Sequence, residues 1–325
     1  MHEEHESHSK WMSLEEAVRR FVPDRAQVCL GGFTVNRNPM AVCREIIRQK
    51  KQNLHLVVHS HGQGLELLIG AGCVQRLELA YGGVARFAPT GIRFKKAFLE
   101  GKIEVEDYTN YQMVLRFQAG AMGLPFIATT SGLQTDIVNK SGFSPEARGR
   151  GKVPREKLTI IPNPLDPAQG EVVILPPLNP DVTLIHAQYA GDDGTIRIKG
   201  LPFADLEQAK AAAHVIVTCE EVLPAARLRA DPDQNSLAHF FADAVIQVPF
   251  GAHPTACHYF YDYDPKHLKL CREMFAEDDL FARYLEEFVY SVPSQEAYLE
   301  AIGKQALQRI QADPELGFAP GLERS

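Results

Sequence analysis

Short apolar runs alternate with amphipathic stretches along most of the chain. The first runs, AQVCLGGF, LHLVV and RLELAY, lie between residues 26 and 81 and are rich in aliphatic residues. Between the first two, Pro39 begins a stretch to about Lys51 in which apolar side chains recur at the spacing of a helix face. Strands that are apolar throughout and are separated by helices are typical of a parallel sheet covered on both sides.

The alternation continues toward the C-terminus. Ser13 and Glu16 form an S-x-x-E capping box, which predicts a short helix that ends before Pro23. Further helices are predicted around Leu65–Ile69, in GIRFKKAFLEG and over Tyr111–Met122, and further strands in IEVEDY, EVVILP, DVTLIHAQY, TIRIKG, AHVIVTCEE and DAVIQVPFG. The sequence therefore predicts an α/β fold, with a largely parallel sheet covered by helices on both faces. Residues 11–325 are expected to form a single domain that ends in a helical region from about residue 265.

Two segments depart from this pattern. Residues 1–10, MHEEHESHSK, hold three histidines among glutamates and no apolar anchor. One interpretation is a metal-binding arm, and the expected one is a disordered tail. Residues 139–169 are basic and contain several glycines and prolines, and the segment is too long for an ordinary connection. It is either a mobile loop or a segment that serves a site or a partner.

Charge and cysteine usage narrow the classes of function. The net charge of −7 over 325 residues speaks against a nucleic-acid-binding face, which needs a basic patch. The six cysteines are scattered, with no CxxC pair, so no metal site is predicted. No apolar run approaches the roughly 20 residues that cross a bilayer, and the charged N-terminus lacks the apolar core of a signal peptide. We therefore expect a cytoplasmic protein without membrane or nucleic-acid partners.

Three turns that follow apolar runs have the composition of anion-binding sites. They are Gly31–Thr34, His59–Gly64 and Ala128–Gly132. In open α/β sheets, ligands bind at the carboxyl ends of the strands, where glycine lets backbone amides approach carboxylate or phosphate groups. A single glycine turn is more often structural, because glycine is the default wherever φ is positive. The fingerprints G-x-G-x-x-G and G-x-x-x-x-G-K-[ST], of a dinucleotide site and a P-loop, are both missing.

Histidines and carboxylates are the candidates for acid–base chemistry. His59 and His61 flank Ser60, but neighbours in an extended segment face opposite sides and there is no G-x-S-x-G elbow, so polar lining of a pocket is favoured over a hydrolytic triad. Glu106-Asp107-Tyr108 and Glu220-Glu221 end two predicted strands. Such pairs are more often a solvated edge or a helix cap than catalytic. Glu106 stays a candidate catalytic residue, and no complete catalytic constellation is found in this chain.

The segment GAHPTACHYFYDYD, from Gly251 to Asp264, concentrates aromatic and histidine side chains after the last predicted strand. It fits the lining of a pocket or a subunit contact, where tyrosine is enriched. Aromatic packing beneath a long loop explains it equally well. The sequence leaves both interpretations open.

Several blocks, in order, resemble the A subunits of the family I CoA-transferases, of the glutaconate kind. They are GGFTVNRNPMAVCREIIRQ, LLIGAG, FKKAFLEGKIEVEDYTN, AGAMGLPF, PDVTLIHAQYAGDDGTIRI, HVIVTCEE and VPFGAHPTACHYFYDYD. The resemblance runs from Trp11 to about Tyr263 and is weaker through the helical tail. It implies an α/β fold shared with other CoA-transferases and sugar-phosphate isomerases. It also implies a separate B subunit, in an A2B2 or larger hetero-oligomer.

The resemblance also implies a mechanism. In such enzymes the B subunit supplies a glutamate that attacks an acyl-CoA, and the resulting glutamyl-CoA thioester passes its CoA to a carboxylic acid. The CoA thioester is then a substrate, no further cofactor is expected, and the A chain contributes walls of the pocket. The substrate-binding residues expected here are Gly31, Gly32, Phe33, Arg37, His59, Ser60, His61, Gly62, Tyr108 and Ser131.

Two features keep the choice of substrate and reaction open. Arg37 has two possible roles. It could hold the distal carboxylate of the substrate, or it could be a surface residue beside a helix. The string HSHGQG replaces the small residues of the glutaconate enzyme after its second strand, which puts dicarboxylate specificity in question. One alternative is a decarboxylase or ring-opening hydrolase acting on a CoA thioester, with His59, His61 and Glu106 as acid–base groups. Another is a non-catalytic partner that shapes the B subunit.

Overall fold

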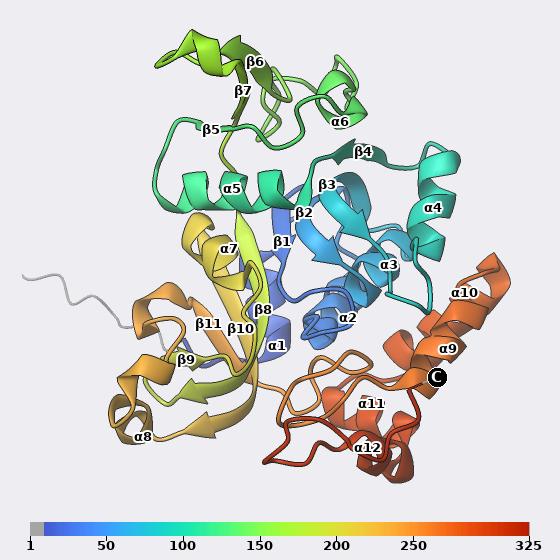
Figure 1. Ribbon diagram of the computed structural model, residues 1–325. Coiled ribbons are helices and arrows are strands. Elements are labelled where there is room, and N and C mark those ends of the chain that lie inside the picture. Colours follow the sequence, from blue (N-terminus) through green and yellow to red (C-terminus); the bar gives the residue numbers. More distant parts are fainter. Residues whose placement is uncertain (1–9, 325) are drawn as a thin grey trace, which may run out of the picture.

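An eight-stranded sheet organises most of the chain (Figure 1). The computed structural model describes residues 10–324, so the expected tail lies, apart from Lys10, outside the described residues. Seven strands run parallel in the order β11-β10-β8-β1-β2-β3-β4, and β9 pairs antiparallel with β8. Their bounds are Gln27–Leu30 (β1), Leu54–His61 (β2), Val74–Gly82 (β3), Glu104–Asp107 (β4), Val182–Gly191 (β8), Ile196–Arg197 (β9), His214–Leu223 (β10) and Ala244–Gln247 (β11).

The direction in which strands are added reverses beside β1. The chain adds β2, β3 and β4 outward on one side of β1, then returns to place β8, β10 and β11 outward on the other side. In register, Cys29 of β1 is paired with Val57 of β2 and with Thr183 of β8. Such a reversal opens a crevice at the carboxyl ends of the two central strands, because the connections leave them in opposite directions.

Helices cover both faces of this sheet, as the sequence pattern predicts. One face packs on α1 (Leu14–Phe21), α2 (Met40–Arg48), α3 (Gln63–Gly70) and α4 (Ile92–Leu99), and the other on α5 (Asn110–Ala121) and α7 (Asp205–Ala211). Successive residues of β1 show why: Val28 and Leu30 join the first core and Cys29 the second. The capping box is confirmed in part, since the Ser13 hydroxyl accepts a hydrogen bond from the Glu16 amide (3.1 Å).

A small antiparallel sheet stands beyond α5, at the top of Figure 1. It consists of β5 (Ile127–Thr129), β7 (Glu171–Leu175) and β6 (Thr159–Pro162), in that order. The sequence alternation predicts that EVVILP belongs to the parallel sheet. This prediction is wrong, because the strand belongs to the second sheet. Its alternate residues Val173 and Leu175 are buried against α5, so one face of the small sheet extends the core.

The segment 139–169 packs against the rest of the chain. It follows α6 (Asp136–Asn139), includes β6 and the 3-10 turn η1 (Pro167–Gln169), and buries Phe143, Ala147 and Val153 together. Carboxylates of β4 hold it: Glu104 accepts from the Ser144 amide at 3.1 Å and Glu106 from the Gly142 amide at 2.6 Å. Its service to a site or a partner stays a prediction.

The remaining elements divide between the two faces: the β10–β11 connection joins α7 on the second face, and the C-terminal helices pack on the first. The β10–β11 connection carries α8 (Ala225–Arg229), η2 (Pro232–Gln234) and η3 (His239–Phe241). The helices of the C-terminal region are α9 (Pro265–Met274), α10 (Asp278–Leu285), a π-helical turn η4 (Glu286–Tyr290), α11 (Gln295–Ile302) and α12 (Lys304–Ile310). Several of their side chains, Phe281 and Tyr298 among them, join the same core as α1–α4.

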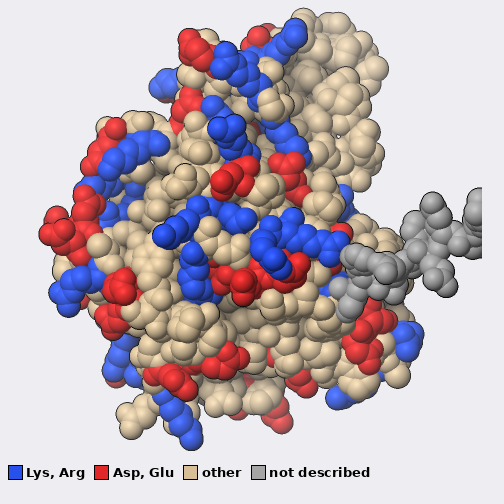
Figure 2. Space-filling view, turned by 180° about the vertical axis from the view of Figure 1, so that it is seen from behind, with Lys and Arg blue, Asp and Glu red and all other residues tan. Residues whose placement is uncertain are grey.

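No helix between residues 10 and 324 is long and apolar enough to cross a membrane. On the face that Figure 2 shows, Lys and Arg side chains lie interspersed with Asp and Glu, without a continuous basic stripe.

Candidate active site

The first two predicted turns meet at the carboxyl ends of β1 and β2. Thr34 forms a parallel bridge with His61, and the Thr34 amide donates to the Ser60 carbonyl at 3.1 Å. Gly62 lies against the same loop, because a Cβ at this position would come within 2.4 Å of the Thr34 carbonyl oxygen. The two turns, Gly31–Thr34 and His59–Gly64, thus form one continuous surface beside the reversal of strand order. We call this surface the rim.

The glycine turn after β1 is tightly packed on the protein itself. Gly32 has φ +82°, and a Cβ there would lie 2.5 Å from the carbonyl oxygens of Asn36 and Arg37, so only glycine fits. The Gly31 amide donates to the Leu184 carbonyl at 2.8 Å, and the Gly32 amide donates to Asp205 Oδ1 at 2.8 Å. Both amides donate to acceptors within the protein. They hold the turn in place and are not free to donate to a substrate.

Arg37 is a buried structural cation and not a surface residue. One guanidinium nitrogen donates to Asp205 Oδ2 at 2.6 Å and to the His186 carbonyl at 3.1 Å, and the other donates to the Leu201 carbonyl at 2.9 Å. Only 1% of its surface is exposed. Asp205 thus supplies a carboxylate partner from within the chain, and the expected contact of Arg37 with a substrate carboxylate stays a prediction.

The two histidines of HSHGQG have different surroundings. His61 is buried: its Nδ1 accepts from the Leu65 amide at 3.3 Å and its Nε2 lies 3.1 Å from the Gly31 carbonyl. Burial lowers the pKa of His61 to about 3, so the ring is neutral and caps α3. His59 is half-buried at the rim, where its ring lies 5.5 Å from that of Phe33. Burial lowers the pKa of His59, and its Nδ1 has no hydrogen-bond partner among the described residues.

Hydroxyl groups of the second and third turns gather at the first turn of α5. The Ser60 hydroxyl donates to Asn110 Oδ1 at 2.6 Å. Ser131 Oγ lies 2.8 Å from the hydroxyl of Thr109, which caps α5. The third turn comes from the small sheet, but these contacts bring it to the end of β2. This position agrees with the prediction that the three turns share one edge of the sheet.

Glu106 lies in β4 and Tyr108 directly follows it, with β3 between β4 and the end of β2. The Tyr108 ring is buried and contacts the cations of Arg116 (4.1 Å) and Lys157 (5.2 Å), and burial raises its pKa. Glu106 is fully buried, with one oxygen accepting from Gly142 and the other bound to Arg148. Both carboxylate oxygens of this catalytic candidate are engaged in holding the 141–148 segment.

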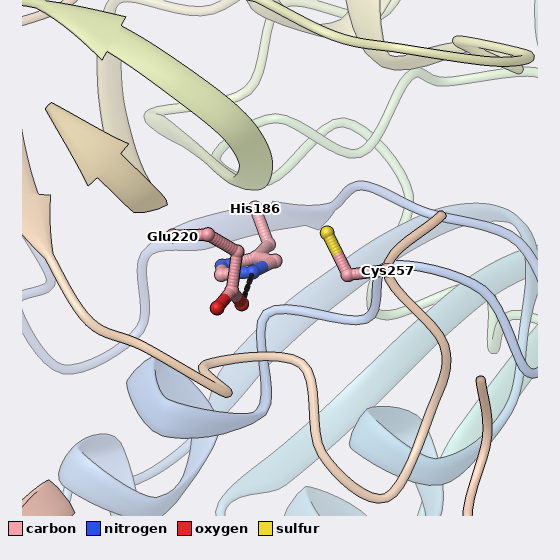
Figure 3. Close-up of side chains that lie close together, drawn as sticks. All are labelled: His186, Glu220 and Cys257. Atoms are coloured by element: carbon pink, nitrogen blue, oxygen red, sulfur yellow. Dashed lines mark hydrogen bonds and ion pairs between the residues drawn. The ribbon is translucent and has the colours of Figure 1, made fainter. Parts of the chain in front are cut away.

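A buried polar cluster supports the rim from the other side (Figure 3). His186 Nε2, from β8, lies 2.6 Å from Glu220 Oε1, from β10, and Glu220 also accepts from the Tyr261 hydroxyl at 2.6 Å. Donor atoms of His186, Glu220 and Cys257 lie within 4.8 Å of one another. Because His186 and Glu220 satisfy each other, the cluster ties β8 and β10 to the aromatic segment and, through the His186 carbonyl, to Arg37.

Sequence reasoning missed Asp205, Phe203 and His186. Asp205 begins α7, more than 160 residues from Arg37, and no local pattern connects the two. Phe203 has φ +53° and its ring is stacked on that of Phe33 at 4.8 Å, in a loop that gave no signal. Glu220 was singled out, and the alternation of β10 places it inward and Glu221 outward.

Hollows large enough for a small molecule lie outside the rim itself. One of about 690 Å³ lies between α1, α2 and α11 and contacts none of the candidate residues. Another of about 600 Å³ lies at the carboxyl ends of β3 and β4 and is lined by side chains that include Tyr81, Phe98, Asp107 and Lys140.

Comparison with known proteins identifies the family. A family model described as coenzyme A transferase matches residues 11–247. The chain is 35% identical to the A subunit of the glutaconate CoA-transferase of Acidaminococcus fermentans, over 95% of this chain and 97% of that one. The chain belongs to the coenzyme A transferase family. The crystal structure of glutaconate CoA-transferase from the same organism is similar with a TM-score of 0.92 at 35% identity, over 96% of this chain and 98% of that one.

Two further members of this group show its range. The A subunit of the 3-oxoadipate CoA-transferase of Pseudomonas knackmussii is 31% identical over 86% of this chain and 93% of its own length. A crystal structure of a variant of the decarboxylase AibA/AibB is similar with a TM-score of 0.67 at 30% identity, over 90% of this chain and 97% of that one. The family and the fold class expected from the sequence are confirmed. The chain is a CoA-transferase subunit of the A type, and its named relatives imply a B-type companion.

Proposed function

We propose that this chain forms part of the substrate pocket of an acyl-CoA:carboxylate CoA-transferase whose B subunit supplies the nucleophilic glutamate. The observation that carries the proposal is the state of the carboxylates near the rim. Glu106, Asp205 and Glu220 each bind protein groups through both oxygens. No carboxylate among these three is available to attack a thioester, which supports a reacting acid that comes from the companion.

The proposed reaction needs only one such carboxylate. It attacks the thioester carbonyl of the acyl-CoA and expels the CoA thiolate, which leaves an acyl–glutamyl anhydride. The thiolate then attacks the glutamyl carbonyl, releases the acyl group as a free acid and forms a glutamyl-CoA thioester. The same steps in reverse, with a second small carboxylic acid, give the new acyl-CoA.

This chain would bind and orient the acyl group. The Ser131 hydroxyl, at the first turn of α5, would donate to a carboxylate or a thioester carbonyl at the rim, and Ser60, whose hydroxyl donates to Asn110, would hold that turn in place. Phe33 and His59 line the same rim and exclude water from one side of it. The paired Arg37 and Asp205 act beneath it as positioning residues. We also propose an A2B2 or larger assembly, in which each rim faces one B subunit.

The test is exchange of CoA by separate and combined subunits. This chain, its B-type companion and the complex of the two are each incubated with acyl-CoA and isotopically labelled acetate. Label is expected in acetyl-CoA only with the complex, and replacement of the B-subunit glutamate by glutamine is expected to abolish it. Trapping with borohydride is expected to modify the B subunit but not this chain. Full activity of this chain alone would contradict the proposal, as would a complex that transfers CoA to no short monocarboxylate, dicarboxylate or 3-oxoacid.

A second candidate is CoA-thioester decarboxylation, which the likeness to the decarboxylase AibA/AibB favours. In that case the half-buried imidazole of His59, whose Nδ1 has no partner among the described residues, would exchange a proton with the substrate. Release of CO2 from a glutaconyl-type CoA without an acceptor acid, by a complex whose B subunit lacks the glutamate, would support this function over transfer.

A further inference from the structure

Three rings form a continuous wall at the rim, and we call Phe203, Phe33 and His59 the aromatic wall. The Phe203 and Phe33 rings are stacked, with centroids 4.8 Å apart and an angle of 11° between their planes. The Phe33 and His59 rings follow at 5.5 Å and 40°. All three side chains are half-buried, so each keeps part of its surface toward the outside of this chain.

The charges beneath the aromatic wall cancel. The guanidinium carbon of Arg37 lies 5.7 Å from the centroid of the Phe203 ring. Among the described residues, Arg37 is the cationic side chain that contacts the aromatic wall. Its charge is matched by Asp205 at 2.6 Å, and both side chains are almost completely buried. Its nitrogens also donate to two backbone carbonyls, those of His186 and Leu201. This pair therefore offers no net positive charge to an anion placed on the wall.

The ring of His59 is polar without being cationic. Burial lowers its pKa, so the imidazole is neutral near pH 7. A neutral imidazole donates one hydrogen bond and accepts another. Its buried Nδ1 has no partner among the described residues. The wall thus presents two flat apolar rings and one neutral polar group.

We propose that the aromatic wall selects acyl groups and acceptor acids whose chain carries no second carboxylate. This inference rests on the proposed function, which puts the acyl group at this rim. A carboxylate taken from water onto such a wall would lose hydration without gaining a counter-charge, whereas an uncharged chain packs against the rings. The named relatives act on glutaconate and 3-oxoadipate, which are dicarboxylates, so this inference sets the chain apart from them in what it would accept.

Crotonate and glutaconate are a matched pair of probes, because they share the unsaturated acid and differ in the terminal carboxylate. With the complex of this chain and its B subunit, kcat/KM for crotonate is expected to exceed that for glutaconate at least tenfold. Binding is measured in parallel by calorimetry, with crotonyl-CoA and glutaconyl-CoA and with the B-subunit glutamate replaced by glutamine so that no turnover occurs. Crotonyl-CoA is expected to bind at least tenfold more tightly. Equal or reversed preference in this binding measurement overturns the inference, whether or not the complex transfers CoA.

A variant with a cation in the wall provides the converse test. His59→Arg is expected to shift the ratio of the two kcat/KM values at least tenfold toward glutaconate. His59→Gln, which keeps a neutral polar group, is expected to retain the crotonate preference. His239→Arg is the matched control, because His239 is an exposed histidine outside the rim. An unchanged ratio in a folded His59→Arg complex, judged by its melting temperature, overturns the inference. If this variant does not fold, the wild-type comparison decides.

Discussion

Arg37 and Asp205 show how one buried ion pair fixes a backbone turn. Arg37 has φ +48°, in the left-handed region, and the Asp205 carboxylate binds its guanidinium and the Gly32 amide together. The pair joins the loop after β1 to the start of α7. Its role is to position the rim, and neither charge reaches the surface.

Asp205→Asn is therefore expected to be severely destabilising. The substitution leaves the Arg37 cation buried without its counter-charge, which costs about 3–5 kcal/mol in comparable cases. Urea denaturation of the wild type and the variant measures the loss in free energy of unfolding. Asp136→Asn is the control, because Asp136 and Lys140 form an exposed pair that contributes about 0–1 kcal/mol. A loss no greater than that of the control would contradict the assigned role.

Which residues stand near the rim could be predicted from their place at strand ends, but the direction of each side chain could not. His61 and His59 both lie at the carboxyl end of β2. Only tertiary packing decides that His61 caps α3 and that His59 faces Phe33. Arg37 has a plausible role as a ligand for a carboxylate until Asp205, distant in sequence, is seen to neutralise it. Pairings of this kind depend on the fold and leave no local signal.

At the scale of elements, strand β4 is the point at which the small sheet is fastened to the large one. Glu106 and Glu104 anchor residues 141–148, and Lys157, itself buried, donates to the Ile137 and Lys140 carbonyls. The parallel strands and their helices were predictable from apolar periodicity. The small sheet was not, because EVVILP has the same apolar pattern whether its neighbours run parallel or antiparallel to it.

Loss of this anchor is expected to expose the basic segment to protease. Glu106→Gln keeps an oxygen for the Gly142 amide but removes the charge that pairs with Arg148. Limited digestion with trypsin, followed by mass spectrometry, is expected to show cleavage between residues 148 and 155 several-fold faster than in the wild type. Glu146→Gln changes an exposed glutamate of the same segment, and trypsin is expected to cleave this variant at the wild-type rate. Identical rates for Glu106→Gln would show that the segment is held by other contacts.

At the scale of the whole molecule, the C-terminal helices and the sheet share one core. Tyr298 and Phe281 pack in the same apolar cluster as β1, β2 and β3. Polar side chains are buried at this junction: His253 Nδ1 lies 2.7 Å from the Tyr298 hydroxyl, and His267 Nε2 lies 3.0 Å from the Tyr284 hydroxyl. Burial lowers the pKa of both imidazoles, so the junction contains histidines that are neutral near pH 7 in the folded protein.

This junction is expected to make the protein acid-labile. Burial lowers the pKa of His267 to about 3, whereas an unfolded histidine titrates near pH 6.5. Between these values the unfolded chain binds a proton that the native protein does not, so stability is greatest above about pH 6.5 and falls toward pH 3. Urea midpoints measured from pH 7 to pH 5 are expected to decline, and to decline less in His267→Gln. His239→Gln, at an exposed position, should follow the wild-type slope, and a His267→Gln slope equal to it would contradict the assignment.

The hydrogen bonds of Gly31 and Gly32 have a consequence for how this scaffold diversifies. Their amides, the Arg37–Asp205 pair and the His186–Glu220 pair form a foundation that is complete without any ligand. The rings of Phe33 and His59 lie above it, half-buried, and take no part in these hydrogen bonds. On the proposed role of the aromatic wall, exchanges at these two positions would alter which acid is accepted while the turn beneath keeps its shape, so new selectivity in descendants of this chain would require few substitutions.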